Sequence, residues 1–109
     1  MRRDVRLLPR AVRKLEQIDE WTQAQFGARQ AERYLGQINA RLLAVADGDA
    51  HIRQLSSLTG DDRHSAIVLL RAGEHFLILD LRRDVIRVVD IVHTRSDLMQ
   101  IVPTDREKR

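Results

Sequence analysis

The chain has 109 residues, with 19 Lys+Arg against 16 Asp+Glu, a formal net charge of +3 and no Cys. This length corresponds to one domain, the lack of Cys excludes disulfides and thiolate metal sites, and no apolar run approaches the ~20 residues that span a bilayer. The basic start MRRDVRLLPR has no apolar segment behind it and does not read as a signal peptide, so we expect a cytoplasmic protein.

The first half of the chain predicts a short strand and two helices. Residues 4–8 alternate polar and apolar side chains, and Pro9 ends this strand or opens the next helix, where its missing N–H costs nothing. Residues 9–26 place apolar side chains at helical spacing, and Gly27 is expected to supply a left-handed cap. A second helical stripe follows and closes at Asp47-Gly48. With so short a joint, the two helices should form an antiparallel hairpin.

The second half predicts a loop and then three strands. Residues 49–62 show no period, so they should form a loop or hold a short turn of helix, packed on the core through Ile52, Leu55 and Leu58. Three apolar runs follow, broken at Ala72-Gly73 and at residues 82–84, which predicts an antiparallel meander. The second joint predicts that Leu77 pairs with Val89, Leu79 with Arg87 and Leu81 with Val85. After His93 we expect a short polar segment with one helical turn through Leu98 and Met99, and residues 103–109 should form a frayed tail.

The expected fold is α+β, with the helical hairpin packed on one face of an antiparallel sheet. The strands of the meander are apolar at nearly every position. Helices on one side would leave the second sheet face, and the groove beside the hairpin, apolar and uncovered. Exposed apolar surfaces of this kind mark interaction sites, so the sequence predicts a docking partner.

Taken together, these motifs resemble the ParE toxins of the RelE/ParE superfamily of type II toxin–antitoxin modules. The matching residues are Pro9-Arg10-Ala11, Leu15, Ile18, Trp21, Phe26-Gly27, Gln30-Ala31, Tyr34 and the closing VHTRSD of residues 92–97. The chain departs from the family pattern at residues 47–49, where Asp-Gly-Asp replaces the usual Asn-Pro, and at residues 62–70, which lack the usual aromatic residues. The resemblance covers residues 4–99 and implies a β-α-α-β-β-β fold over a single bacterial toxin domain, residues 1–109.

The resemblance also implies partners. ParE-like members act on DNA gyrase and are neutralised by an acidic antitoxin. Here the antitoxin is expected to be ParD-like, with a ribbon-helix-helix N-terminal half. The toxin would contact DNA only indirectly, through this antitoxin. The many Arg side chains suit an acidic partner and would speed association. We therefore expect a non-catalytic gyrase inhibitor in a heteromeric complex, without a cofactor. The candidate antitoxin contacts are Leu15, Ile18, Trp21, Leu42, Leu69, Leu77 and Leu79.

RelE-like members cleave messenger RNA on the ribosome, and this is the alternative function. Cleavage of RNA without a metal needs a base, an acid and cations around the phosphate. The sole Tyr, Tyr34, lies on an apolar helix stripe, Thr94 follows His93, and Lys is scarce, all of which argue against a ribonuclease. Its candidate catalytic residues would be Arg63, Arg71, His93 and Arg95. A third possibility is a degenerate, non-toxic relative that survives as an antitoxin-bound repressor subunit.

The C-terminal motif admits two interpretations. Asp97 can cap a turn or pair with Arg95 while His93 closes the last strand. Otherwise the segment contacts the target, and the candidates are then Arg87, His93, Arg95 and Asp97.

Other polar and aromatic residues also have two interpretations. Asp80 and Asp90 suggest an acid/base pair, or, as we favour, ion pairs with Arg82 or Arg87. The four His residues lack metal-ligand spacing, so no metal site is expected. Trp21 is either a core residue or a partner anchor.

Overall fold

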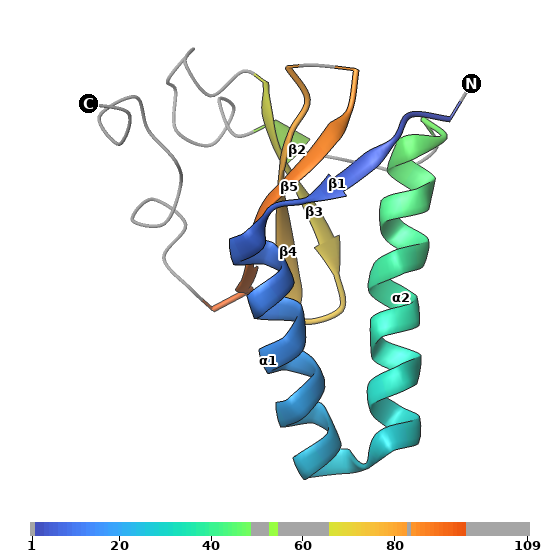
Figure 1. Ribbon diagram of the computed structural model, residues 1–109, viewed down its shortest axis with the longest axis vertical. Helices are drawn as coiled ribbons and strands as arrows, with labels where there is room; N and C mark the ends of the chain where they lie inside the picture. The colour runs from blue at the N-terminus through green and yellow to red at the C-terminus, as the bar shows by residue number, and fades with distance from the viewer. Residues whose placement is uncertain (1, 49–52, 55–65, 83, 96–109) are drawn as a thin grey trace.

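The computed structural model describes residues 2–48, 53–54, 66–82 and 84–95, and these form one helical hairpin and one sheet (Figure 1). The helices are α1 (Pro9–Phe26) and α2 (Ala28–Ala46). The strands are β1 (Val5–Leu7), β2 (Arg53–Gln54), β3 (Ile67–Ala72), β4 (His75–Asp80) and β5 (Ile86–His93). The predicted α+β order is confirmed, with the two-residue strand β2 as an addition. Predictions that fall on residues 49–52, 55–65 and 96–109 lie outside the described residues.

Helix α1 has the bounds that the sequence predicts. Leu8 is extended, and Pro9 follows as the first helical residue, where no intrahelical partner for an N–H is lost. At the other end, Gly27 has φ 94° and ψ 166°, a region open in practice to glycine alone. This differs from the left-handed helical cap expected from the sequence. The Gly27 N–H donates to the carbonyl of Gln23 and its own carbonyl accepts from the N–H of Ala31, so one residue ends α1 and starts α2.

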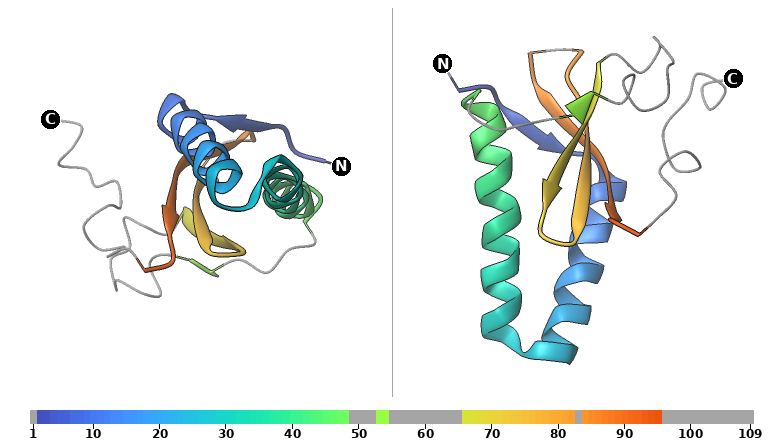
Figure 2. Two further views of the ribbon diagram at one scale, coloured as in Figure 1. Left: turned by 90° about the horizontal axis from the view of Figure 1, so that it is seen from below. Right: turned by 180° about the vertical axis from the view of Figure 1, so that it is seen from behind.

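The two helices run antiparallel and cover one face of the sheet, and their joint projects past the turn between β3 and β4 (Figures 1 and 2). The main core lies between this hairpin and the sheet. Its fully buried members include Ile38 of α2, Leu70 of β3 and Leu77 of β4. Among the described residues, neither helix is both long and apolar enough to cross a bilayer.

The sheet is mixed, which corrects the expectation of a wholly antiparallel one. Its strand order is β1-β5-β4-β3-β2, and β1 pairs with β5 in parallel while the other neighbours are antiparallel. The N–H of Ile86 donates to the carbonyl of Asp4, and that of Leu8 to the carbonyl of Val88. The first strand thus lies along the last one, far away in the sequence, before α1 leaves the sheet.

The predicted register of β4 and β5 is wrong. Leu79 pairs with Val88 rather than Arg87, and Leu77 pairs with Ile91 rather than Val89. The error is one residue near the joint and two residues beyond it, because a β-bulge inserts Val89 between the two pairs. As a result, His75 at the start of β4 lies directly opposite His93 at the end of β5.

The second sheet face is not the open apolar surface that the sequence predicted. It carries a smaller cluster of Ile67, Leu69, Ile78 and Val92, each at most 7% exposed, against which Phe76 and Val89 pack. These side chains are buried within the single chain. A docking surface on this molecule must therefore be sought elsewhere.

Candidate functional site

A groove with a volume of about 710 Å³ lies between the helical hairpin and the end of the sheet where β4 begins and β5 ends. Helix α1 contributes Ile18 and Trp21, and α2 contributes Tyr34. The strands contribute Ile91 and the two histidines that face each other across β4 and β5. The apolar groove beside the hairpin that the sequence predicted is thus present.

The outer part of the groove is formed by two exposed aromatic side chains. Trp21 is 60% exposed and Phe26 is 65% exposed, and their rings meet edge to face with centroids 5.9 Å apart. Trp21 is therefore not a core residue, and the interpretation as a partner anchor is the one that its exposure supports. Exposed aromatic clusters of this kind are enriched where proteins bind each other.

At the inner end of the groove, the hydroxyl of Tyr34 holds the turn between β3 and β4. It accepts a hydrogen bond from the N–H of Glu74 at 2.9 Å and lies 3.2 Å from the carbonyl oxygen of Ala72. It also lies 2.6 Å from Nδ1 of His75. Burial raises the pKa of Tyr34 above its ordinary value, so the hydroxyl keeps its proton at neutral pH.

Two imidazole rings lie in contact beside Tyr34. The rings of His75 and His93 have centroids 5.3 Å apart in an edge-to-face arrangement. Nδ1 of His93 accepts a hydrogen bond from the N–H of Arg95 at 3.1 Å. Burial, and next the neighbouring His93, lower the pKa of His75 below its ordinary value, because both disfavour the charged ring.

Both carboxylates that are buried in the described part of the chain lie against cations. Asp90 lies 3.6 Å from Nζ of Lys14 and 3.8 Å from Arg10, rather than beside Arg87. Asp80 accepts hydrogen bonds from Arg82 as short as 2.6 Å. The favoured ion-pair interpretation holds for both acids, with a different partner for Asp90. In the described part of the chain, no cluster of three or more metal-ligating side chains occurs.

The predicted antitoxin contacts divide into two sets. Leu15 and Ile18 are partly buried at the edge of the core, and Ile18 lines the groove next to Trp21. For four other residues the prediction is wrong, because side chains this deeply buried offer no contact surface. They are Leu42, Leu69, Leu77 and Leu79, each at most 5% exposed.

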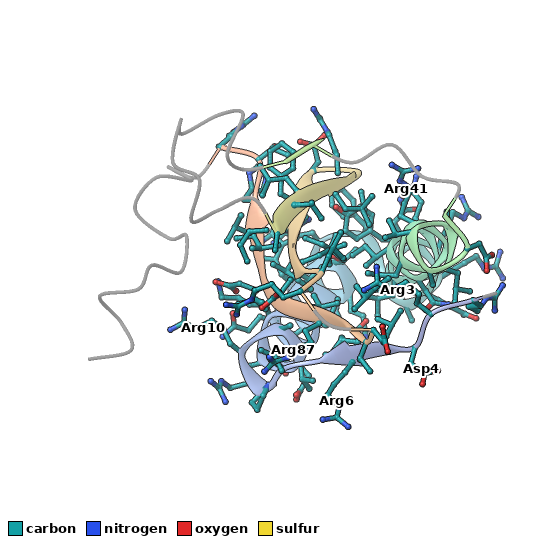
Figure 3. The ribbon with its side chains drawn as sticks, turned by 90° about the horizontal axis from the view of Figure 1, so that it is seen from above. Arg3, Asp4, Arg6, Arg10, Arg41 and Arg87 are labelled. Atoms are coloured by element: carbon teal, nitrogen blue, oxygen red, sulfur yellow. The ribbon has the colours of Figure 1, made fainter. Side chains whose placement is uncertain are left out.

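The predicted target contacts do not lie together. Arg87, near the start of β5, pairs in register with Arg6 of β1 (Figure 3). His93 lies six residues further along β5, roughly 20 Å away at strand spacing, with Arg95 beside it. Asp97 is outside the described residues.

The ribonuclease candidates are only partly placed. Arg71 is exposed near the end of β3, where its Nε donates to the carbonyl of Gly73. His93 lines the groove and Arg95 is exposed beside it. Arg63 lies outside the described residues.

A comparison of the sequence with family profiles matches residues 5–98 to the family described as "ParE toxin of type II toxin-antitoxin system, parDE". The chain belongs to this ParE toxin family. No curated protein matches the sequence. A solved structure titled "Chromosomal ParDE TA system from P. aeruginosa" is similar with a TM-score of 0.62 and 14% identity, over 84% of this chain and 95% of that one. At this identity the similarity shows the fold alone.

Sequence reasoning missed the inner end of the groove in this ParE toxin. The sequence places Tyr34 on the apolar stripe of its helix, and it gives His75 only as one of four histidines without metal-ligand spacing. A register two residues in error would have placed His75 opposite Ile91 instead of His93. The signal that was available is a histidine at the outer end of each of two adjacent strands.

Proposed function

We propose that this ParE toxin inhibits DNA gyrase by binding to it and that a cognate antitoxin neutralises it. The observation that supports this proposal is the match of residues 5–98 to the ParE toxin family. The chain acts as a binding protein in this account, in the cytoplasm where gyrase is found.

The chemistry of the described residues supports a binding function. The two buried carboxylates are held by cations, Asp80 by Arg82 and Asp90 by Lys14 and Arg10. The single Tyr hydroxyl is engaged by the turn between β3 and β4. A general base or acid must be within reach of substrate and not committed to a structural contact.

The groove is the proposed docking site of the antitoxin. An amphipathic segment can lay its apolar face on Ile18, Trp21 and Phe26, a mode of recognition that helices commonly use. The aromatic pair supplies large, rigid contact area at the entrance. An acidic antitoxin fits the positive net charge of the chain.

The proposed gyrase contact is the arginine surface of Arg6 and Arg87, defined by these two side chains, which pair in register across β1 and β5 (Figure 3). Arg87 is the predicted target contact in this set. This surface lies at the other end of β5 from the groove. An antitoxin segment docked in the groove would therefore not cover these arginines directly, and neutralisation would depend on the assembly of the whole antitoxin with the toxin.

The experiment is a supercoiling assay with purified gyrase and purified toxin. We expect supercoiling to stop at stoichiometric toxin and to recover when the antitoxin encoded by the adjacent gene is added. An Arg6→Glu, Arg87→Glu double variant should fail to inhibit while still binding the antitoxin. Supercoiling that continues at an excess of folded toxin would remove the proposal.

A ribosome-dependent ribonuclease is the second candidate, and the contact between His75 and His93 favours it, because two imidazoles can serve as base and acid. It predicts cleaved messenger RNA within minutes of induction. His93→Ala and Arg71→Ala should each abolish that cleavage. Intact transcripts in cells whose growth has stopped would exclude it.

A further inference from the structure

The contacts of Tyr34 determine which nitrogen of His75 carries the proton. A phenol hydroxyl donates one hydrogen and accepts two. The carbonyl of Ala72 can only accept, and the N–H of Glu74 can only donate. All three contacts are therefore satisfied together only when Nδ1 of His75 donates to the hydroxyl. The neutral ring of His75 then has its lone pair on Nε2.

The neutral ring of His93 has the opposite tautomer. Its Nδ1 accepts the N–H of Arg95 at 3.1 Å, so its own proton lies on Nε2. A proton added to Nε2 of His75 disturbs none of the three contacts of Tyr34. Once it is added, both rings present an N–H donor at Nε2. The pair is thus built to take up one proton and to become a two-donor site.

The groups facing His75 keep it neutral when the groove is empty. Burial, and next His93 of β5, lower the affinity of this ring for a proton, Glu74 raises it, and Lys14 of α1 lowers it further. Tyr34 of α2 is a neutral neighbour, since its hydroxyl keeps its proton. The ammonium of Lys14 is shared with the buried carboxylate of Asp90, so the imidazole pair is the group that would attract an anionic group of a partner, once His75 has taken up its proton.

We propose that the His75–His93 pair binds a carboxylate of the antitoxin and that docking of this acidic segment in the groove takes up a proton at His75. The occupant follows from the match between two N–H donors and one carboxylate and from the positive net charge of the chain, and the inference rests on the antitoxin docking proposed above. The carboxylate would accept hydrogen bonds from both rings while the apolar side chains of the same segment cover Ile18, Trp21 and Phe26. A charge-assisted pair of this kind is stronger than a neutral one.

The consequence is an affinity that depends on pH. A group that gains a proton on binding makes the complex tighter as the pH falls toward its pKa in the complex. From pH 8 to pH 6, the dissociation constant of the toxin–antitoxin complex should fall by roughly threefold to tenfold. An apolar groove with no titrating contact would show no such change.

The test is isothermal titration calorimetry of purified toxin with the antitoxin encoded by the adjacent gene, at pH 6, 7 and 8 and in two buffers of different ionisation enthalpy. We expect proton uptake near pH 7 and tighter binding at pH 6, both lost in His75→Gln. Because that substitution also alters the contact with Tyr34, an NMR titration of the wild-type imidazoles provides a second measurement. The pKa of His75 should be higher in the complex than in the free toxin.

Each outcome has one meaning. Binding that is equally tight at all three pH values, an unchanged pKa of His75, or the same pH dependence in a folded His75→Gln variant would overturn this inference while leaving antitoxin docking intact. Absence of binding at every pH would overturn antitoxin docking and this inference together.

Discussion

The ring of Tyr34 closes over Gly73, and its hydroxyl lies 2.6 Å from Nδ1 of His75. Gly73 is at the turn between β3 and β4 with φ +60°, and a Cβ at this position would lie 2.6 Å from Cε1 of Tyr34. The turn, the tyrosine and the histidine are thus packed as one unit. The shape of the inner groove depends on a residue without a side chain.

Gly73→Ala should destabilise the toxin by about 1–3 kcal/mol, since the new methyl group meets the Tyr34 ring and the backbone is in the left-handed region. The measurement is denaturant unfolding at pH 7. Gly36→Ala is the matched control, because Gly36 lies exposed in α2 with nothing within 4 Å of a new Cβ. In this control variant the free energy of unfolding should rise by about 0.5–1 kcal/mol. Equal effects of the two substitutions would contradict the packing described here.

Asp80→Asn should cost about 1–3 kcal/mol at pH 7, because the buried carboxylate would lose its charge-assisted hydrogen bonds from Arg82. Burial acts to raise the pKa of Asp80, but the hydrogen bonds from Arg82 outweigh it and leave the pKa below its ordinary value of 3.8. The stabilisation is therefore present above pH 3.8 and lost as the pH falls below it.

Unfolding curves of wild-type and Asp80→Asn toxin at pH 7 and at pH 3 test whether the stabilisation by Asp80 is lost at low pH. The difference in stability should narrow at pH 3. Asp47→Asn, which breaks the exposed pair of Asp47 with Arg2, should change little at either pH. A gap between wild type and Asp80→Asn that stays constant from pH 7 to pH 3 would argue against the assignment.

The helical hairpin was the part of the fold that the sequence predicted best. Pro9 and Gly27 mark the helix ends through their own backbone preferences, and the apolar stripe between them is long enough for its helical spacing to be recognised. The sheet was harder, because pairing between strands is decided by contacts far apart along the chain. The bulge at Val89, the parallel pairing of β1 and the two-residue strand β2 leave no local pattern.

In the candidate site too, the residues on helices were predicted and the pairing between strands was missed. Ile18 and Trp21 were found because a helix places its residues predictably on one face. The pairing of His75 with His93 was missed because it requires the correct register at the far side of the bulge. The second sheet face was expected to be open because its residues are apolar, but composition alone does not show whether a chain buries them itself.

The free toxin should lose stability in mild acid through His75. Burial and the adjacent His93 lower the pKa of His75 below 6.5, so its contribution to stability is present above pH 6.5 and is lost as the pH falls through the lowered value. Chemical unfolding at pH 7.5 and pH 5.5 should show a larger loss for wild type than for His75→Gln. Parallel losses in the two proteins would mean that other groups cause the acid sensitivity.

Trp21→Ala should weaken antitoxin binding by roughly tenfold to a hundredfold, as expected for an exposed aromatic anchor at the entrance of a groove. Its effect on the unfolding free energy should be small, because the side chain is 60% exposed. Val12→Ala is the matched control, since Val12 is an exposed apolar residue of α1 that does not line the groove. Equal affinities of the two variants for the antitoxin would place the interface elsewhere.

The most direct test of the central claim is the dependence of gyrase inhibition on toxin concentration. A toxin that acts by occupying gyrase should reach half-inhibition of supercoiling at a toxin concentration that rises in proportion to the gyrase concentration, once gyrase is well above the dissociation constant. Antitoxin added in equal amount should restore supercoiling. Undiminished supercoiling at a large excess of folded toxin, together with cleaved messenger RNA in cells that express it, would contradict the account.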